Sequence, residues 1–137
     1  MTFQRVPVET LLRVLVVDDS TAVRERLRLH VDDVDGVQVV GEASDGHQAV
    51  ALLETADPHV VVLDLRMPGL NGFGTLKEIK ARDPSRTVIV MTNYAYPQYR
   101  QRCLKEGADF FLDKSTDFPM LRQILADLAR RPREGPR

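Results

Sequence analysis

The feature that most constrains the fold is an alternation, repeated five times, of a short apolar run with a longer segment whose apolar residues recur at helical spacing. Apolar, β-branched runs of this kind are typical of parallel strands that are buried on both faces by helices. The predicted strands are residues 14–17, 37–43, 60–65, 87–92 and 110–112. The pattern predicts one α/β domain with a doubly wound parallel sheet.

Polar side chains follow four of these five strands at the point where each strand ends. Asp18 and Asp19 follow the first strand, Asp64 ends the third, Thr92 ends the fourth, and Lys114 comes shortly after the fifth. Ligands of such sheets bind beyond the carboxyl ends of the strands, where the winding reverses. If the first and third strands are neighbours, three carboxylates meet at one edge of the sheet.

Three carboxylates in one place require compensation. Two like charges about 4 Å apart repel by about 4 kcal/mol at an effective dielectric constant near 20. Either one acid is protonated with a raised pKa, or a divalent cation lies among them. Oxygen ligands suit Mg²⁺. A magnesium ion beside a hydroxyl and a lysine suits a phosphoryl group, which Asp64 is placed to attack at phosphorus.

The chain resembles the receiver domains of two-component response regulators, the CheY-like family. The resemblance rests on "VVDDS", "VVLDLRMPGLNG", "VIVMTN" and "GADFFLDK", and it covers about residues 12–130. Each motif alone is weak, but the combination is specific because every polar residue stands at its own strand end. Together with the alternation, the resemblance predicts a flavodoxin-like sheet of five parallel strands in the order 2-1-3-4-5.

The resemblance implies a phosphorylation site at Asp64 and a site for Mg²⁺ around it. Asp19 would bind the metal directly and Asp18 partly through water. The backbone carbonyl of Arg66 would be a further ligand, beside Asp64 itself. The phosphoryl donor would be a phosphohistidine on a sensor histidine kinase or a histidine phosphotransfer protein.

The resemblance also implies a switch. Thr92 and Lys114 would bind the phosphoryl group, and Phe111 would swing inward as the switch aromatic. Because Phe110 is adjacent, a slip of one residue would exchange the faces of these two side chains. The response would appear on the face formed by the fourth helix, fifth strand and fifth helix, where an unknown downstream protein or a second copy would bind.

Two positions depart from the family pattern. Where the family usually has proline after the lysine, with a cis bond, the chain has Ser115. A cis bond before a residue other than proline costs about 2.5 to 4 kcal/mol, so the bond is trans or the fold bears that cost. After Thr92, where the family has a very small residue, Asn93 and Tyr94 follow. We expect Arg66 and Tyr94 to hinder the hydrolytic water.

Composition narrows the possible partners and the compartment. With 19 Lys and Arg residues against 20 Asp and Glu residues, the net charge of −1 predicts no direct binding of nucleic acid or membrane. The single cysteine, Cys103, excludes an internal disulfide and is expected to be packed rather than reactive. No signal-peptide pattern or membrane-length apolar run occurs, so the predicted compartment is the cytoplasm.

We expect three parts along the chain: a lead-in at residues 1–11, the receiver domain at 12–130, and a basic disordered tail at 131–137. The receiver is either free-standing or the first part of a longer regulator. It is not expected to be an enzyme beyond assisting its own phosphorylation and dephosphorylation.

The sequence also bears on three other functions. An aspartyl phosphatase or phosphotransferase commonly has a second Asp two residues after the nucleophile, where this chain has Arg66. A nucleotide- or flavin-binding domain would need a glycine-rich phosphate loop after the first strand, which is missing. A pseudo-receiver that binds partners without phosphorylation stays open because of Asn93 and Ser115.

Overall fold

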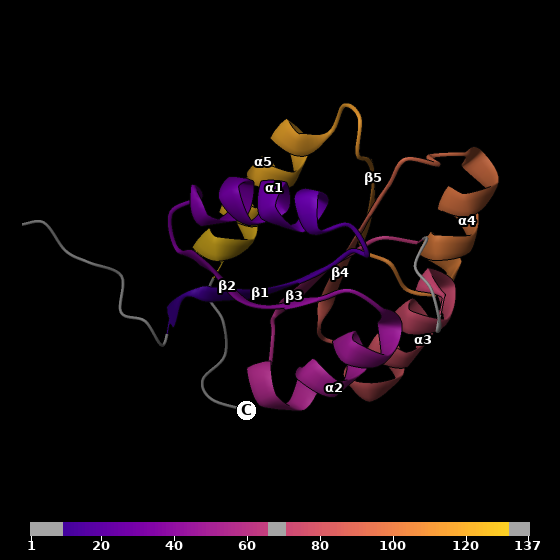
Figure 1. The fold of residues 1–137 in the computed structure, drawn as a ribbon, viewed down its shortest axis with the longest axis horizontal. Helices are drawn as coiled ribbons and strands as arrows, with labels where there is room; N and C mark the ends of the chain where they lie inside the picture. The colour runs from indigo at the N-terminus through magenta and orange to yellow at the C-terminus, as the bar shows by residue number, and fades with distance from the viewer. Residues whose placement is uncertain (1–9, 66–70, 132–137) are drawn as a thin grey trace, which may run out of the picture.

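The computed structural model describes residues 10–65 and 71–131, and these form a five-stranded parallel sheet flanked by helices (Figure 1). The strands are β1 (Leu12–Val17), β2 (Val37–Ala43), β3 (Val60–Leu63), β4 (Thr87–Thr92) and β5 (Phe110–Asp113). The helices are α1 (Thr21–Asp32), α2 (Gly46–Ala56), α3 (Gly72–Arg82), α4 (Pro97–Lys105) and α5 (Phe118–Arg130). The strand order is β2-β1-β3-β4-β5, which confirms the predicted fold class.

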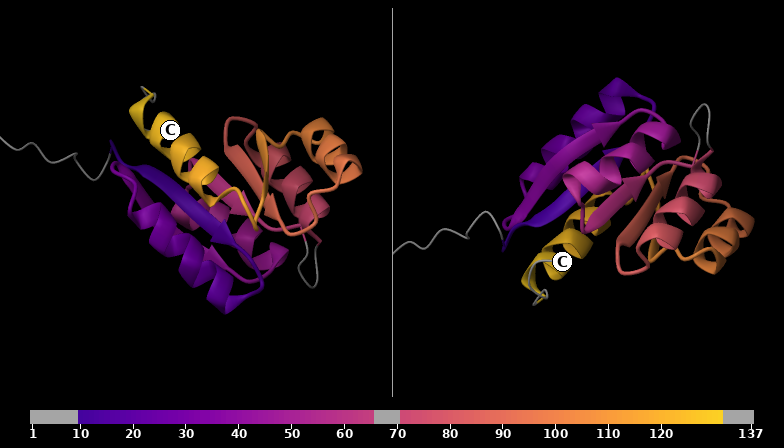
Figure 2. Two further views of the ribbon diagram at one scale, coloured as in Figure 1. Left: turned by 90° about the horizontal axis from the view of Figure 1, so that it is seen from above. Right: turned by 90° about the horizontal axis from the view of Figure 1, so that it is seen from below.

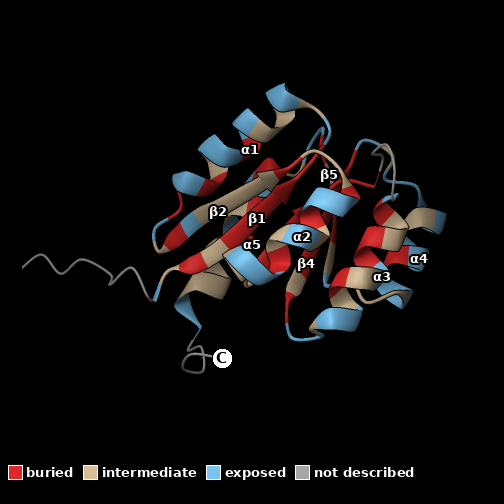
Figure 3. Ribbon diagram, turned by 60° about the horizontal axis from the view of Figure 1, so that its bottom comes forward, coloured by how far each residue is buried: buried red, intermediate tan, exposed pale blue. Residues whose placement is uncertain are grey.

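The sheet separates two layers of helices, as the views in Figures 1 and 2 show. Helices α1 and α5 cover one face, and α2, α3 and α4 cover the other. Alternate residues of β1 enter the two cores: Val14 and Val16 pack on the α1 and α5 side, while Leu15 and Val17 pack on the opposite side. Because successive side chains of a strand point to opposite faces, a strand covered on both sides must be apolar throughout. Figure 3 shows this burial along the central strands.

Polar cap residues mark the start of the first three helices. The side chains of Ser20, Asp45 and Asn71 each accept a hydrogen bond from a backbone N–H in the first turn of α1, α2 and α3. The third strand is shorter than predicted, since its ladder ends at Leu63. No helix among residues 10–65 and 71–131 is both long enough and apolar enough to cross a membrane.

The edge of the sheet opposite the strand carboxyl ends is held by a buried arginine. Arg86, only 8% exposed, donates to the backbone oxygens of Pro58 at 3.1 Å and Leu53 at 3.1 Å. Its guanidinium also pairs with Asp57 at 3.0 Å, and Arg13 reaches the same carboxylate at 3.2 Å. Asp57 ends α2 in the left-handed region, with φ of 43°. These contacts satisfy carbonyl oxygens at the end of α2 and join it to β1 and β4.

We expect Arg86→Met to lower the free energy of unfolding by about 2–3 kcal/mol, because Pro58 O loses its guanidinium donor and Leu53 O keeps only the backbone N–H of Asp57. Urea unfolding followed by circular dichroism measures this. The matched control is Arg100→Met on the exposed side of α4, expected to change the free energy by less than about 0.5 kcal/mol. Equal stability of the two variants would show that the contacts of Arg86 do not stabilise the fold.

Candidate functional site

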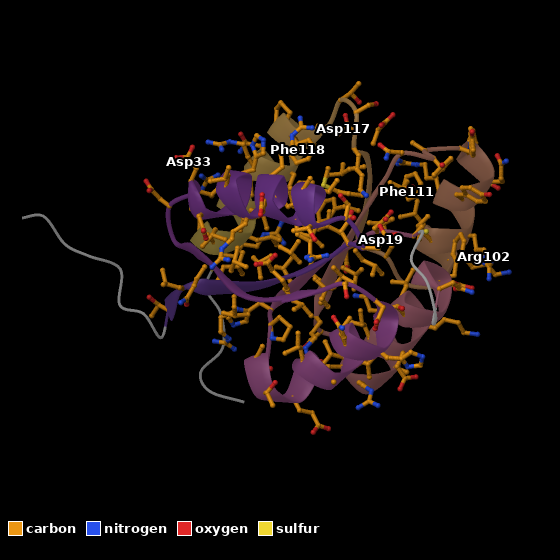
Figure 4. The ribbon with its side chains drawn as sticks, viewed as in Figure 1. Asp19, Asp33, Arg102, Phe111, Asp117 and Phe118 are labelled. Atoms are coloured by element: carbon orange, nitrogen blue, oxygen red, sulfur yellow. The ribbon has the colours of Figure 1, made fainter. Side chains whose placement is uncertain are left out.

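Three carboxylates converge at the carboxyl edge of the sheet. Asp18 follows β1, Asp64 follows β3, and these strands are paired with Val17 opposite Leu63. The backbone N–H of Asp64 donates to Val17 O at 3.0 Å, which carries the pairing as far as the two acids. One oxygen from each of Asp18, Asp19 and Asp64 lies within 4.8 Å of the others. Asp18 and Asp64 are buried, whereas Asp19 is exposed (Figure 4).

A buried lysine compensates part of this negative charge. The ammonium nitrogen of Lys114 pairs with Asp18 Oδ2 and lies 3.3 Å from Asp64 Oδ2. The lysine is 8% exposed, and its backbone N–H donates to Thr92 O at 3.0 Å, which fixes the start of its side chain beside β4. The sequence left a protonated acid or a divalent cation as alternatives. The structure adds a third source of compensation, a cation from the chain itself.

Asp18 is also held by neighbours that sequence reasoning did not single out. Its Oδ1 accepts from Ser20 N at 2.9 Å, and its backbone oxygen accepts from Arg24 Nη1 at 2.7 Å. Arg24 in turn lies 3.4 Å from Glu42 on β2. The one signal in the sequence was the helical position of Arg24, one turn after the cap residue Ser20. Arg24 therefore orients the turn that carries Asp18 and Asp19 by binding a backbone oxygen of that turn.

Thr92 ends β4 beside the acids and is fully buried. Its Oγ1 accepts a hydrogen bond from Tyr94 N at 3.0 Å, which leaves the hydroxyl hydrogen available to donate elsewhere. A cavity of about 140 Å³ lies at this position, lined by Leu65, Phe73, Thr92, Tyr94 and Tyr99. The side chain of Tyr94 thus borders the same space as Thr92, while Asn93 is exposed.

The two adjacent phenylalanines of β5 take opposite faces of the sheet. Phe111, paired with Val90, is 8% exposed and belongs to the core on the α2, α3 and α4 side (Figure 4). Phe110 is half-buried against the other core. Phe111 is therefore the aromatic residue of β5 that faces α4, and the structure holds it in a buried position. Its inward swing stays a prediction.

The peptide bond between Lys114 and Ser115 is trans, as is every other peptide bond in the described part of the chain. Asp113 Oδ1 accepts from Ser115 N at 2.8 Å and from Ser115 Oγ at 2.6 Å. The hydrogen bond from the Ser115 hydroxyl lowers the pKa of Asp113 below its ordinary value. Asp113 N donates to Asp117 Oδ2 at 2.8 Å, which ties the loop to the start of α5. Ser115 thus closes the turn by a side-chain hydrogen bond, without the proline usual at this position.

Gly72, at the start of α3, packs closely against Leu65, the residue after Asp64. Gly72 N donates to Leu65 O at 3.0 Å, and a Cβ at Gly72 would lie 2.3 Å from Leu65 Cα. Only glycine allows the backbone to approach this closely. The carbonyl of Arg66, predicted as a metal ligand, lies outside the described residues.

Cys103 does not contribute to this chemistry. It is buried in α4, and burial raises the pKa of its thiol to about 11. A thiol that stays protonated at neutral pH is not a nucleophile, which agrees with the packed role predicted for it.

Comparison with known proteins shows the family to which the chain belongs. The family model of the response regulator receiver domain matches residues 14–126. The nitrate/nitrite response regulator protein NarL of Escherichia coli K12 is 34% identical over 104 residues, which cover 76% of this chain and 48% of that protein. The chain belongs to the response regulator receiver domain family. It spans about half the length of such curated relatives.

Solved structures agree with this assignment. The response regulator domain of CheB from Thermotoga maritima matches with a TM-score of 0.76 at 33% identity, covering 88% of this chain and 94% of that one. A chain of the CheX–CheY–BeF₃–Mg²⁺ complex from Borrelia burgdorferi matches with a TM-score of 0.80 at 27% identity, covering 88% of this chain and 90% of that one. Both likenesses extend over the whole sheet and its helices.

We expect Lys114→Met to lower the free energy of unfolding by about 3–5 kcal/mol in EDTA, because buried Asp18 and Asp64 lose a cation. Added Mg²⁺ should restore part of the loss, since an ion bound only by the folded state stabilises it. Urea unfolding with EDTA and with Mg²⁺ measures both effects. Lys77→Met, at an exposed lysine with no ion pair in the described part of the chain, is the control. Parental stability of Lys114→Met in EDTA would contradict the compensation.

Proposed function

We propose that this receiver domain accepts a phosphoryl group on Asp64 from a phosphohistidine of a sensor histidine kinase or a histidine phosphotransfer protein. One observation carries the proposal. The buried carboxylate of Asp64 lies in one cluster with Asp18, Asp19 and Lys114, at the edge of the sheet where ligands of this fold bind. A carboxylate beside further acids and a cation is suited to phosphoryl transfer.

The acidic cluster fits Mg²⁺. Its donors are all carboxylate oxygens, within 4.8 Å of one another, and Mg²⁺ binds through a few carboxylates while keeping several waters. Asp19 and Asp64 would hold the ion directly, and Asp18, already engaged with Lys114, would act partly through water. When bound, the metal supplies positive charge for the phosphoryl oxygens. The magnesium in the related CheX–CheY complex supports this choice of ion.

The side chains of the chain itself account for the remaining steps. A carboxylate oxygen of Asp64 attacks phosphorus, the bond from phosphorus to the histidine nitrogen breaks, and the electron pair leaves with that nitrogen. The product is an acyl phosphate on Asp64. Lys114 donates a hydrogen bond to a phosphoryl oxygen, and the Thr92 hydroxyl, whose hydrogen is available, donates to another.

Phosphorylation replaces the carboxylate of Asp64 by a dianionic phosphoryl group. Lys114 and Thr92 are then attracted toward the phosphoryl oxygens. We propose that their movement admits a shift of Phe111 and changes the face formed by α4, β5 and α5. A downstream protein or a second copy of the chain would read that change. The protein would act by this binding, not by turning over a substrate, whether it works alone or as the receiver part of a longer regulator.

Incubation with acetyl phosphate and Mg²⁺ should give a single phosphoryl adduct, read by intact mass. We expect Asp64→Asn to give none, because it removes the nucleophile. Asp127→Asn on the exposed side of α5 should behave as the parent, and EDTA should abolish the adduct. An adduct that persists in Asp64→Asn would place the acceptor elsewhere. Failure of the parent with acetyl phosphate and with phosphohistidine donors would favour a pseudo-receiver.

We expect the acyl phosphate to be long-lived, because Tyr94 borders the space beside Thr92, where it would hinder the hydrolytic water. Arg66, predicted to act with it, lies outside the described residues. Tyr94→Ala should shorten its lifetime by about tenfold, which corresponds to about 1.4 kcal/mol in the barrier to hydrolysis. Tyr96→Ala, at an exposed tyrosine that does not line the cavity, is the control. Loss of the adduct over time with Mg²⁺ present measures the lifetime. A parental lifetime of seconds or less would contradict the expectation.

A further inference from the structure

A groove runs between α3 and α4, and none of the three clustered acids lines it. Its volume is about 640 Å³, and its walls are Lys77, Lys80 and Ala81 from α3 and Arg102, Lys105 and Glu106 from α4 and its end. We call it the α3–α4 groove. The two helices lie next to each other in both views of Figure 2, and Arg102 projects from α4 in Figure 4.

Helical spacing places the positive charges of the groove in two facing rows. Lys77 and Lys80 are three residues apart on α3, and Arg102 and Lys105 are three residues apart on α4. Residues at this spacing share one side of a helix. Four of the six lining residues are therefore cations, and Glu106 is the only acid among them.

Two of these cations belong to the framework of the groove. Lys80 Nζ pairs with Asp109 at 2.7 Å and donates to Arg86 O at 2.6 Å. The guanidinium of Arg102 lies over the Phe73 ring, 3.9 Å from its centroid, and is 3.5 Å from Glu106. A cation placed over an aromatic face is held there by the ring quadrupole.

The other two cations are not neutralised within the described chain. Lys77 and Lys105 are exposed, and neither forms an ion pair with any residue in 10–65 or 71–131. The chain as a whole is nearly neutral, at −1, so the groove is a local excess of positive charge. A cleft lined by one sign of charge raises the local concentration of ligands of the opposite sign.

The groove suits a protein segment better than a nucleic acid. Its lining combines Ala81 with lysines and an arginine, whose aliphatic stems add apolar surface beside their charged groups. Sites for single-stranded nucleic acid add aromatic platforms on which bases stack, and the lining contains no aromatic residue. A segment with acidic and small apolar residues matches both the cations and the apolar part of this lining.

We propose that the α3–α4 groove binds an acidic, extended segment of a partner protein, with Lys77 and Lys105 pairing with its carboxylates. The groove shares α4 with the face formed by α4, β5 and α5, but its other side is α3. It lies next to the phosphoryl site, because the Phe73 ring under Arg102 also lines the cavity beside Thr92. Binding does not depend on phosphorylation, so it is tested on the unphosphorylated protein and stands or falls separately from the proposed acceptor role.

The probe is a set of fluorescent ten-residue peptides that combine Glu with Ala and Leu at different spacings. Fluorescence anisotropy should show binding by at least one member, weakening as salt is added. The double variant Lys77→Glu/Lys105→Glu should bind that peptide about tenfold more weakly, since two attractive pairs become repulsive. Amide shifts in NMR spectra should be largest along α3 and α4 at the groove.

The matched control is Arg100→Glu/Arg131→Glu, which changes the net charge by the same amount at two exposed positions outside the groove. It should bind as the parent. Equal weakening in both double variants would show nonspecific attraction and overturn the proposal, as would the absence of binding by every peptide. A ten-nucleotide dT oligomer could instead bind more tightly than every peptide and lose affinity in Lys77→Glu/Lys105→Glu. That result would overturn the proposal of a protein partner and identify a nucleic acid as the ligand of the groove.

Discussion

The carboxyl edge of this domain depends on the buried pairing of Lys114 with Asp18 and Asp64. Two carboxylates that leave water lose their hydration, and without a cation their burial would be strongly unfavourable. The lysine comes from beyond β5, while the acids follow β1 and β3. One ion-pair cluster therefore ties three strand ends together. Because Lys114 is shared between two acids, the cluster tolerates changes in charge at Asp64 without leaving Asp18 unpaired.

The parallel sheet assigns different tasks to its two edges. At the edge where strands begin, Arg86 and Arg13 hold the end of α2 through Asp57 and backbone carbonyls. These hydrogen bonds are internal and leave little polar capacity for a ligand. At the edge where strands end, Asp19 is exposed and the Thr92 hydroxyl keeps a hydrogen to donate. The proposed phosphoryl transfer therefore uses the edge at which polar groups can still bind a ligand.

The sequence predicted those features that follow from local pattern and strand direction. The second and fourth strands were predicted at residues 37–43 and 87–92, where the structure has them, because both runs are rich in β-branched residues. β4 is buried in the sheet, whereas β2 is an edge strand that is buried only at its two ends. The meeting of Asp18 and Asp64 followed from the order of the strands. The pairing of Lys114 with these acids, and the bonds of Arg24 and Ser115, could not be predicted, since they depend on how loops close in three dimensions. The third strand was predicted two residues too long: β3 ends at Leu63, although Asp64 N still donates to Val17 O beyond it.

The same ion pair sets a limit on any switch that uses this site. In the unphosphorylated domain Lys114 already has two carboxylate partners, and Thr92 already accepts a hydrogen bond from Tyr94. A phosphoryl group on Asp64 must compete with these contacts, so the conformational shift equals only the difference between new and old interactions. Phe111 is buried and Phe73 is covered by Arg102, so these two aromatic side chains are packed before any phosphoryl group arrives. A change at Asp64 would therefore reach the surface by rearranging side chains that are already packed. Such a rearrangement favours a shift between discrete arrangements over gradual movement.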